Sequence, residues 1–349
     1  MPTLMPRDLF KPEVLTPMIE RRVQESARWD LGALAEFEQT RRTRVKLNVR
    51  AGTLSRLGQF RSDNALTPLS VPRFSAATME ISMPLLSEKE IILEDTLRQL
   101  NSVDDDLATE AVAEILDQAE RLRIQNINLT RWMVFRALMD TLTVTYPNGS
   151  GIDIDYGIEN ADGGMSASHL PTAGVLWSNA AADVIGDTIA WSTLITNDAG
   201  VPQTDLEYWM SSTVWNALQK NTAIQQQVGT VAEPVRPTRT AQVAEVLGIR
   251  AINLYDKQYK DTANVTQRYL PENRAILVGR ETGGQAIVRV LDGPVVRYEP
   301  GTQRLRVGNN PGAVTEVWAT PDPPVENIRV TTARMPLVLR EGVVCANVR

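Results

Sequence analysis

Residues 103–142 read VDDDLATEAVAEILDQAERLRIQNINLTRWMVFRALMDTL, and this stretch is the strongest structural signal in the chain. Apolar residues recur at steps of three and four from Val103 to Leu122, and the pattern continues to Met139, which predicts an amphipathic helix. Neither proline nor glycine interrupts it, and Ser102 followed by Asp105 is typical of a capping box. A helix of about 40 residues is about 60 Å long, so other segments must lie along it.

The composition is that of a folded, acidic protein. The 349 residues include 36 Lys and Arg against 42 Asp and Glu, and 43% are hydrophobic. The net charge of -6 argues against a surface that coats nucleic acid throughout, although local basic patches remain compatible with it. No run approaches the roughly 18 apolar residues that span a bilayer, and residues 1–10 lack the apolar core of a signal peptide. We therefore expect a protein made in a cytosol, with no membrane partner.

The first 85 residues are poor in segments that would form a core. Four prolines precede a short, mostly polar helix that we predict over residues 18–24. Residues 44–50 and 77–85 alternate polar with apolar side chains, and glycines and prolines lie between them, which predicts a long β-hairpin. An isolated hairpin is marginally stable in water. We expect both the arm and the hairpin to lie on something else, above all on neighbouring chains.

The rest of the chain predicts an α+β fold. Residues 152–156 alternate as a strand. Helices are expected over 180–196, 211–219 and 240–247, with strands over 206–209 and 249–255. The chain beyond residue 265 reads mainly as strand and turn, with candidate strands at 268–270, 275–278, 286–291, 295–298, 314–319 and 328–332.

No residue pattern predicts a catalytic centre. A Ser-His-Asp triad would need His169, the only histidine, but no nucleophile motif accompanies it, so we interpret it as a solvated loop residue. The single cysteine, Cys345, excludes an intrachain disulfide and a zinc cluster, and we expect it half-buried near a C-terminal strand. Residues 279–284, GRETGG, lack the order of a phosphate loop and predict a turn between strands.

Two acidic groups are candidate metal sites. Residues 104–106, all Asp, begin the long helix, where negative charge meets the positive end of the helix dipole. Asp153 and Asp155 lie two apart on a strand and share a face, so they could bind Mg²⁺ or Ca²⁺. No further ligand pattern accompanies them, and we favour a solvated strand face. We expect no metal and no cofactor.

A basic run stands out from the acidic chain. Between residues 41 and 61 there are seven basic residues and no acidic one. Three interpretations stay open: contact with nucleic acid, contact with acidic surfaces of neighbouring copies, or a solvated face. Only Phe60 is aromatic, which weakens the first of these, and we favour the second. The candidate inter-subunit contacts are Arg41, Arg42, Arg44, Lys46, Arg50, Arg56 and Arg61.

Three local motifs, in order, resemble one protein family. They are Arg136-Ala137-Leu138 followed by residues 152–157 (IDIDYG), residues 269–273 (YLPEN) followed by 275–279 (AILVG), and residues 334–339 (RMPLVL). They resemble the helix end, the central signature and the closing segment of the lambda-type major capsid protein E family. With the order of predicted elements, the likeness covers most of the chain and implies the fold of tailed-bacteriophage capsids, the Hong Kong 97-like fold.

The resemblance implies a named layout and a function. The layout is an N-terminal arm at 1–42, an E-loop at 43–87, the spine helix with the first part of the peripheral (P) domain at 88–160, the axial (A) domain at 161–261, and return strands of the P domain at 262–349. Hexamers and pentamers would form an icosahedral shell around double-stranded phage DNA, without catalysis. No long helical prodomain precedes the arm, so we expect a separate scaffolding protein.

The same resemblance implies a location and further partners. We expect assembly in the cytoplasm of the bacterial host, a portal through which DNA enters, and a final place in the virion capsid, with a decoration protein left open. Two other function classes were considered. An encapsulin-like nanocompartment shell would share this fold but hold enzymes, and a hydrolase would need His169 or the Asp153–Asp155 pair.

Overall fold

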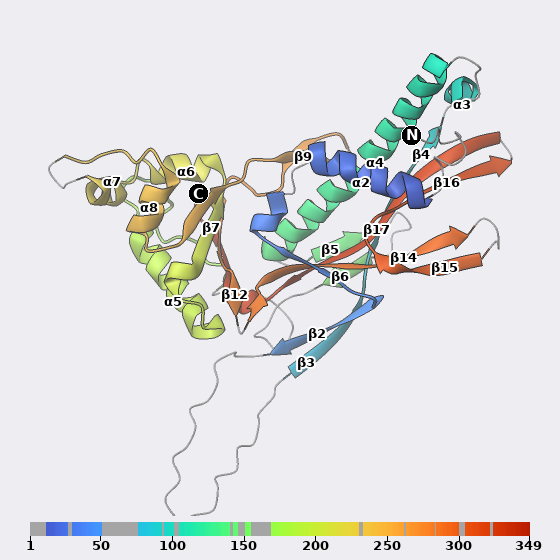
Figure 1. Ribbon diagram of the computed structural model, residues 1–349. Coiled ribbons are helices and arrows are strands. Elements are labelled where there is room, and N and C mark those ends of the chain that lie inside the picture. The colour runs from blue at the N-terminus through green and yellow to red at the C-terminus, as the bar shows by residue number, and fades with distance from the viewer. Residues whose placement is uncertain are drawn as a thin grey trace, which may run out of the picture. The chain divides into compact units, whose positions relative to one another are not determined.

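The computed structural model describes residues 12–26, 30–50, 76–92, 94–100, 105–139, 142–145, 151–154, 169–229, 233–261, 263–282, 284–299, 304–321 and 324–349 (Figure 1). The chain divides into two units. The first unit comprises Met1–Val45, Ser82–Val134 and Arg289–Pro336, and the second comprises Lys46–Ile81, Phe135–Val288 and Leu337–Arg349. The five ranges expected from the sequence remain a prediction.

The first unit is built on a six-stranded sheet. Its strands are β1 (Glu36–Gln39), β4 (Leu85–Ile92), β14 (Val288–Glu299), β15 (Arg304–Pro311), β16 (Val314–Pro321) and β17 (Pro324–Val338). The order is β1-β14-β17-β16, with β15 on β14 and β4 on β17. The long strand β17 is antiparallel to both β16 and β4, whereas β1 runs parallel to β14. Ile328 and Val330, two apart on β17, are both fully buried and give the sheet an apolar face.

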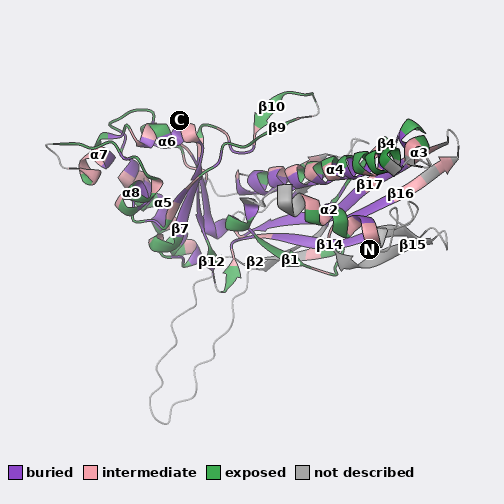
Figure 2. Cartoon of the chain, turned by 45° about the horizontal axis from the view of Figure 1, so that its top comes forward, coloured by how far each residue is buried: buried purple, intermediate pink, exposed green. Residues whose placement is uncertain are grey.

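The predicted long helix is confirmed as α4 (Asp105–Met139), which has 35 residues and is therefore about 52 Å long. Ala111, Ile115 and Ala119 recur every fourth residue, are fully buried, and pack in one core with Ile328 and Val330 of the sheet. The opposite side of the helix is exposed (Figure 2). A short helix α3 (Glu94–Leu100) precedes α4, and Ser102 of the expected capping box lies outside the described residues.

The arm contains more helix than the sequence predicted, and it has a buried face. Helix α2 spans Pro12–Ser26, with Pro17 inside it, and is followed by the 3₁₀ turn η1 (Asp30–Ala33). Leu15 and Ile19, one turn apart, are 0% and 1% exposed and join the core formed by α4 and β17. The expectation that the arm needs another surface is confirmed. For α2 that surface is its own chain, which corrects the expectation of a neighbouring copy.

The second unit contains a four-stranded sheet in the order β18-β11-β7-β8. The strands are β7 (Leu206–Met210), β8 (Ala251–Leu254), β11 (Arg274–Gly279) and β18 (Val343–Asn347). β11 is antiparallel to both β18 and β7, and β7 is parallel to β8. All five residues of β7 are buried, as expected for a strand covered on both faces. The helices are α5 (Val184–Ala199), α6 (Ser212–Leu218), α7 (Thr222–Val228) and α8 (Thr240–Val246).

The ends of these elements follow local chemistry. Asp183 caps α5 by accepting the N–H of Gly186, and Gly200 ends the helix with φ 70°, a left-handed conformation that suits glycine. The helix expected over 180–196 is present, but it begins later, at Val184, and continues to Ala199. Cys345 lies on β18 and is fully buried, so the expectation of half-burial was wrong.

Short two-stranded sheets complete the described fold. They pair β2 (Arg44–Arg50) with β3 (Ala76–Ser82), β5 (Leu142–Thr145) with β6 (Gly151–Ile154), β9 (Gln258–Lys260) with β10 (Thr266–Arg268), and β12 (Glu281–Thr282) with β13 (Gln285–Ala286). Two more 3₁₀ turns are η3 (Gln203–Asp205) and η4 (Arg340–Gly342). The β2–β3 pair confirms the predicted hairpin, and β12 with β13 confirms the turn predicted at 279–284.

Candidate assembly surfaces

His169 is buried, so its interpretation as a solvated loop residue was wrong. Its side chain is 5% exposed, its Nδ1 atom lies 2.8 Å from the carbonyl oxygen of Val343, and its Nε2 atom lies 3.1 Å from Oδ2 of Asp198. The ring therefore ties residue 169 to strand β18 and to the last turn of α5. Both ring nitrogens contact structural groups, which suits a structural role.

The two acidic groups lie mostly outside the described residues. Asp104 and Asp155, and the side chains of Asp105 and Asp153, are outside the described residues, and Asp106 is exposed at the first turn of α4. In the described part of the chain no three His, Cys, Asp or Glu side chains gather where they could hold a metal ion. Within that same part, no helix is both long and apolar enough to span a membrane.

The basic run begins at a point that is tied to the first unit's sheet. Thr40 donates its N–H to the carbonyl oxygen of Asp292 on β14 over 2.9 Å, and Met83 donates its N–H to Thr43 over 3.1 Å. The side chains of Arg41, Arg42 and Arg44 are exposed, and no ion pair joins them to another described residue. Strand β2 carries Lys46 and Arg50, whose side chains are not described, and Arg56 and Arg61 lie outside the described residues.

The first half of α4 is the acidic counterpart of that run. Residues 105–120 contain six acidic residues and no basic one. Asp106, Glu110, Glu114 and Asp117 are exposed. Arg22 of α2 lies 2.8 Å from Asp117, and Thr96 donates to Glu114 over 2.9 Å. Part of this acidic surface is thus balanced within the chain, and it extends well beyond the acidic group expected at residues 104–106.

The face of β4 that carries Leu85 and Ile91 exposes apolar side chains. Leu85 and Ile91 are 52% and 50% exposed, whereas Leu86 and Ile92, on the other face, are 3% and 0% exposed. Ser87 and Lys89 lie between them on that face, so the two residues are scattered and do not form a contiguous apolar patch.

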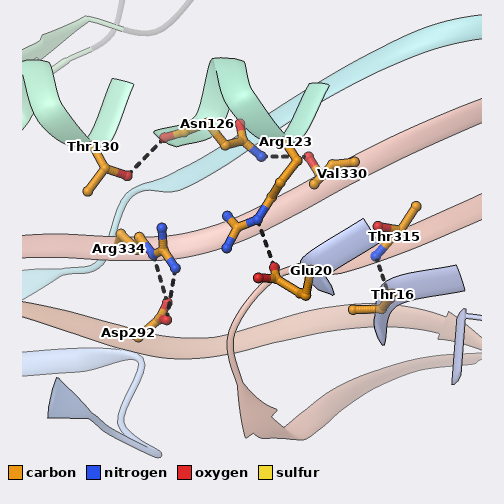
Figure 3. Close-up of polar contacts among 9 residues, drawn as sticks. All are labelled: Thr16, Glu20, Arg123, Asn126, Thr130, Asp292, Thr315, Val330 and Arg334. Carbon is orange, nitrogen blue, oxygen red and sulfur yellow. Dashed lines mark hydrogen bonds and ion pairs between the residues drawn. The ribbon is translucent and has the colours of Figure 1, made fainter. Parts of the chain in front are cut away.

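Buried charged and polar contacts hold α2, α4 and the sheet together (Figure 3). Glu20 of α2 forms an ion pair with Arg123 of α4, 2.7 Å between Oε1 and Nε. Arg334 of β17 forms a bidentate pair with Asp292 of β14. The amide of Asn126 donates to the carbonyl oxygen of Val330 over 3.1 Å. These contacts join residues that lie from 42 to 204 positions apart in the chain, so no local sequence pattern indicates them.

Comparison with known proteins points to one family. The family model described as phage major capsid protein E matches residues 14–347. No curated protein matches the chain. A protein assigned as the capsid protein of a prophage of Escherichia coli CFT073 superposes with a TM-score of 0.51 at 15% identity, over 81% of this chain and 83% of that one. A phage-related protein from Bordetella bronchiseptica RB50 superposes with a TM-score of 0.56 at 10% identity, over 95% and 96%.

Proposed function

The chain belongs to the phage major capsid protein E family, and we propose that its copies form the hexamers and pentamers of an icosahedral shell around double-stranded phage DNA. It has the Hong Kong 97-like capsid fold and is a shell-forming structural protein of the virion capsid. The observation that carries the proposal is the family match across nearly the whole chain. We propose no enzymatic role: both ring nitrogens of His169 contact structural groups, and in the described part of the chain no three His, Cys, Asp or Glu side chains gather as a metal site.

The proposed layout follows the family. We assign residues 1–42 to the N-terminal arm, 43–87 to the E-loop, 88–160 to the spine helix and first part of the P domain, 161–261 to the A domain and 262–349 to the return strands. The β2–β3 pair supports the E-loop assignment and α4 supports the spine helix. We further propose a separate scaffolding protein, a portal, and assembly in the host cytoplasm.

The basic run fits a contact between copies. Arg41, Arg42 and Arg44 are exposed and free of ion pairs to described residues, and the first half of α4 offers exposed carboxylates of opposite sign. We propose that the basic run of one subunit lies against the acidic half of α4 in a neighbour. Exposed ion pairs are individually weak and screened by salt. A shell repeats the contact in every subunit, so the sum governs assembly.

A charge-swap experiment tests this contact. In the full-length protein expressed with its scaffold, Arg41→Glu with Arg42→Glu should abolish sedimenting shells, while the melting temperature of the subunit stays within about 2 °C. Adding Glu110→Arg with Glu114→Arg should restore shells, because every copy carries both halves of the contact. Lys220→Glu with Lys260→Glu, two exposed residues of the second unit, is the matched control and should leave assembly unchanged.

The outcomes separate the three interpretations of the basic run. Loss of shells without rescue by the charge swap would reject the α4 contact. Normal empty shells that fail to retain DNA would favour nucleic acid as the partner. Normal assembly and normal DNA content would leave a solvated face.

A further inference from the structure

Helix α2 is seated on its own subunit by both apolar and polar contacts. Leu15 and Ile19 are buried in the core of the first unit. On the same helix, the hydroxyl oxygen of Thr16 accepts the backbone N–H of Thr315 over 3.1 Å. That N–H belongs to β16. Because Thr16 accepts it, this donor is not left unpaired at the edge of the sheet. The arm helix is therefore an integral part of this unit.

One polar contact of α2 reaches a fully buried cation. The side chain of Arg123 on α4 is 2% exposed, and the carboxylate of Glu20 lies 2.7 Å from its Nε atom (Figure 3). The Nη1 atom of Arg123 is also buried and has no hydrogen-bond partner. An ionised side chain in such a place is costly unless an opposite charge accompanies it.

The charges around Arg123 balance only when the arm is docked. Arg334, which is 4% exposed, adds a second buried cation, and Asp292 pairs with it. Burial lowers the pKa of Arg123, and the positive charge of Arg334 lowers it further, whereas Glu20 and Asp292 oppose both effects. Two cations thus face two carboxylates. Glu20 is the carboxylate that comes from the arm, and without its charge the docked helix would bury Arg123 without this partner.

We propose that the Glu20–Arg123 pair is a charge latch that keeps the arm helix on the subunit that carries it. Docking of α2 brings the carboxylate of Glu20 to Arg123, which is buried beside Arg334, and so offsets the cost of burying that cation. Docking of α2 is therefore a property of the folded subunit and does not require contact with neighbouring copies. This inference does not depend on the proposed contact of the basic run.

Hydrogen exchange of the full-length protein, read by mass spectrometry on peptides covering residues 12–26, tests the latch. Glu20→Gln keeps the shape and removes the charge. It should speed exchange in α2 by roughly ten- to hundredfold. This effect is smaller than that expected for a fully buried pair, because the Glu20 side chain is 29% exposed. Exchange in α5, in the second unit, should not change. Arg22→Gln breaks the exposed pair with Asp117 and is the matched control, with an expected change below about threefold.

The decisive variant is the double substitution Glu20→Gln with Arg123→Met. Removing the buried cation removes the need for the carboxylate, so α2 should regain exchange rates close to those of the wild type. Wild-type exchange in Glu20→Gln alone would overturn the latch, and so would a double variant that exchanges as fast as Glu20→Gln. If Glu20→Gln fails to fold, a folded double variant supports the latch, and a double variant that also fails while Arg123→Met folds rejects it.

Discussion

Arg334 donates two parallel hydrogen bonds to Asp292, from Nε to Oδ1 and from Nη2 to Oδ2, each 3.1 Å long. The pair joins β17 to β14 inside the first unit's sheet, and the Arg334 guanidinium lies 5.9 Å from the ring centroid of Phe37 on β1. Three strands therefore meet at one buried cation. Such pairs fix which strands can be neighbours, since any other register leaves a charge buried alone.

Removing one partner of this pair should lower the free energy of unfolding more than replacing both partners. Asp292→Ala removes the bidentate carboxylate partner of the buried Arg334 and should lower the free energy of unfolding by about 3–5 kcal/mol. Asp292→Leu combined with Arg334→Met should lower it by less than the single substitution. Urea denaturation of both variants measures the difference. A double variant less stable than Asp292→Ala would show that the pair stabilises the sheet beyond charge balance.

The buried apolar side chains of α2 should stabilise its docking as much as its polar contacts do. Ile19→Ala opens a cavity in the core shared with α4 and β17 and should destabilise the first unit by about 2–4 kcal/mol. Met18 is the neighbouring residue and is 36% exposed, so Met18→Ala should change stability by less than about 1 kcal/mol. Equal effects in denaturant titration would mean that α2 is not held through its buried face.

His169 should act in folding and not in chemistry. His169→Leu removes both ring nitrogens and leaves the carbonyl of Val343 without this partner, which should cost about 1–3 kcal/mol. The measurement is the free energy of unfolding of the full-length protein at neutral pH. Unchanged stability would show that the contacts of the His169 ring do not stabilise the fold.

Asp187 should give the second unit a pH-dependent stability. Burial raises its pKa above the ordinary value of 3.8, and the hydrogen bond from Nε1 of Trp177 partly opposes that rise. The folded state then binds more protons than the unfolded state just above pH 3.8, so this contribution to stability falls as pH rises through the window up to the raised pKa. In Asp187→Asn this component of the pH profile should be absent. Trp177→Phe removes the hydrogen bond that opposes the rise in the pKa of Asp187. The loss of stability with rising pH should therefore be larger in this variant.

The sequence predicted those parts of the fold whose signal is local. Helix α4 was found because its apolar residues repeat over many turns, and the turn at 279–284 because glycine marks it. The buried face of α2 was missed because Leu15 and Ile19 meet partners about 100 and 300 residues away. His169 was misjudged for the same reason: Val343 is 174 residues along the chain. Ion pairs such as Glu20–Arg123 depend on which segments the fold brings together, and a single sequence does not state this.

The central claim is that copies of this chain build a closed shell, and cryo-electron microscopy of particles made by the full-length protein with its scaffold tests it most directly. The account predicts closed shells whose capsomers show five-fold and six-fold symmetry, with α4 resolved as a continuous rod in each subunit. Particles that never form, with the folded chain remaining monomeric with and without scaffold, would contradict it.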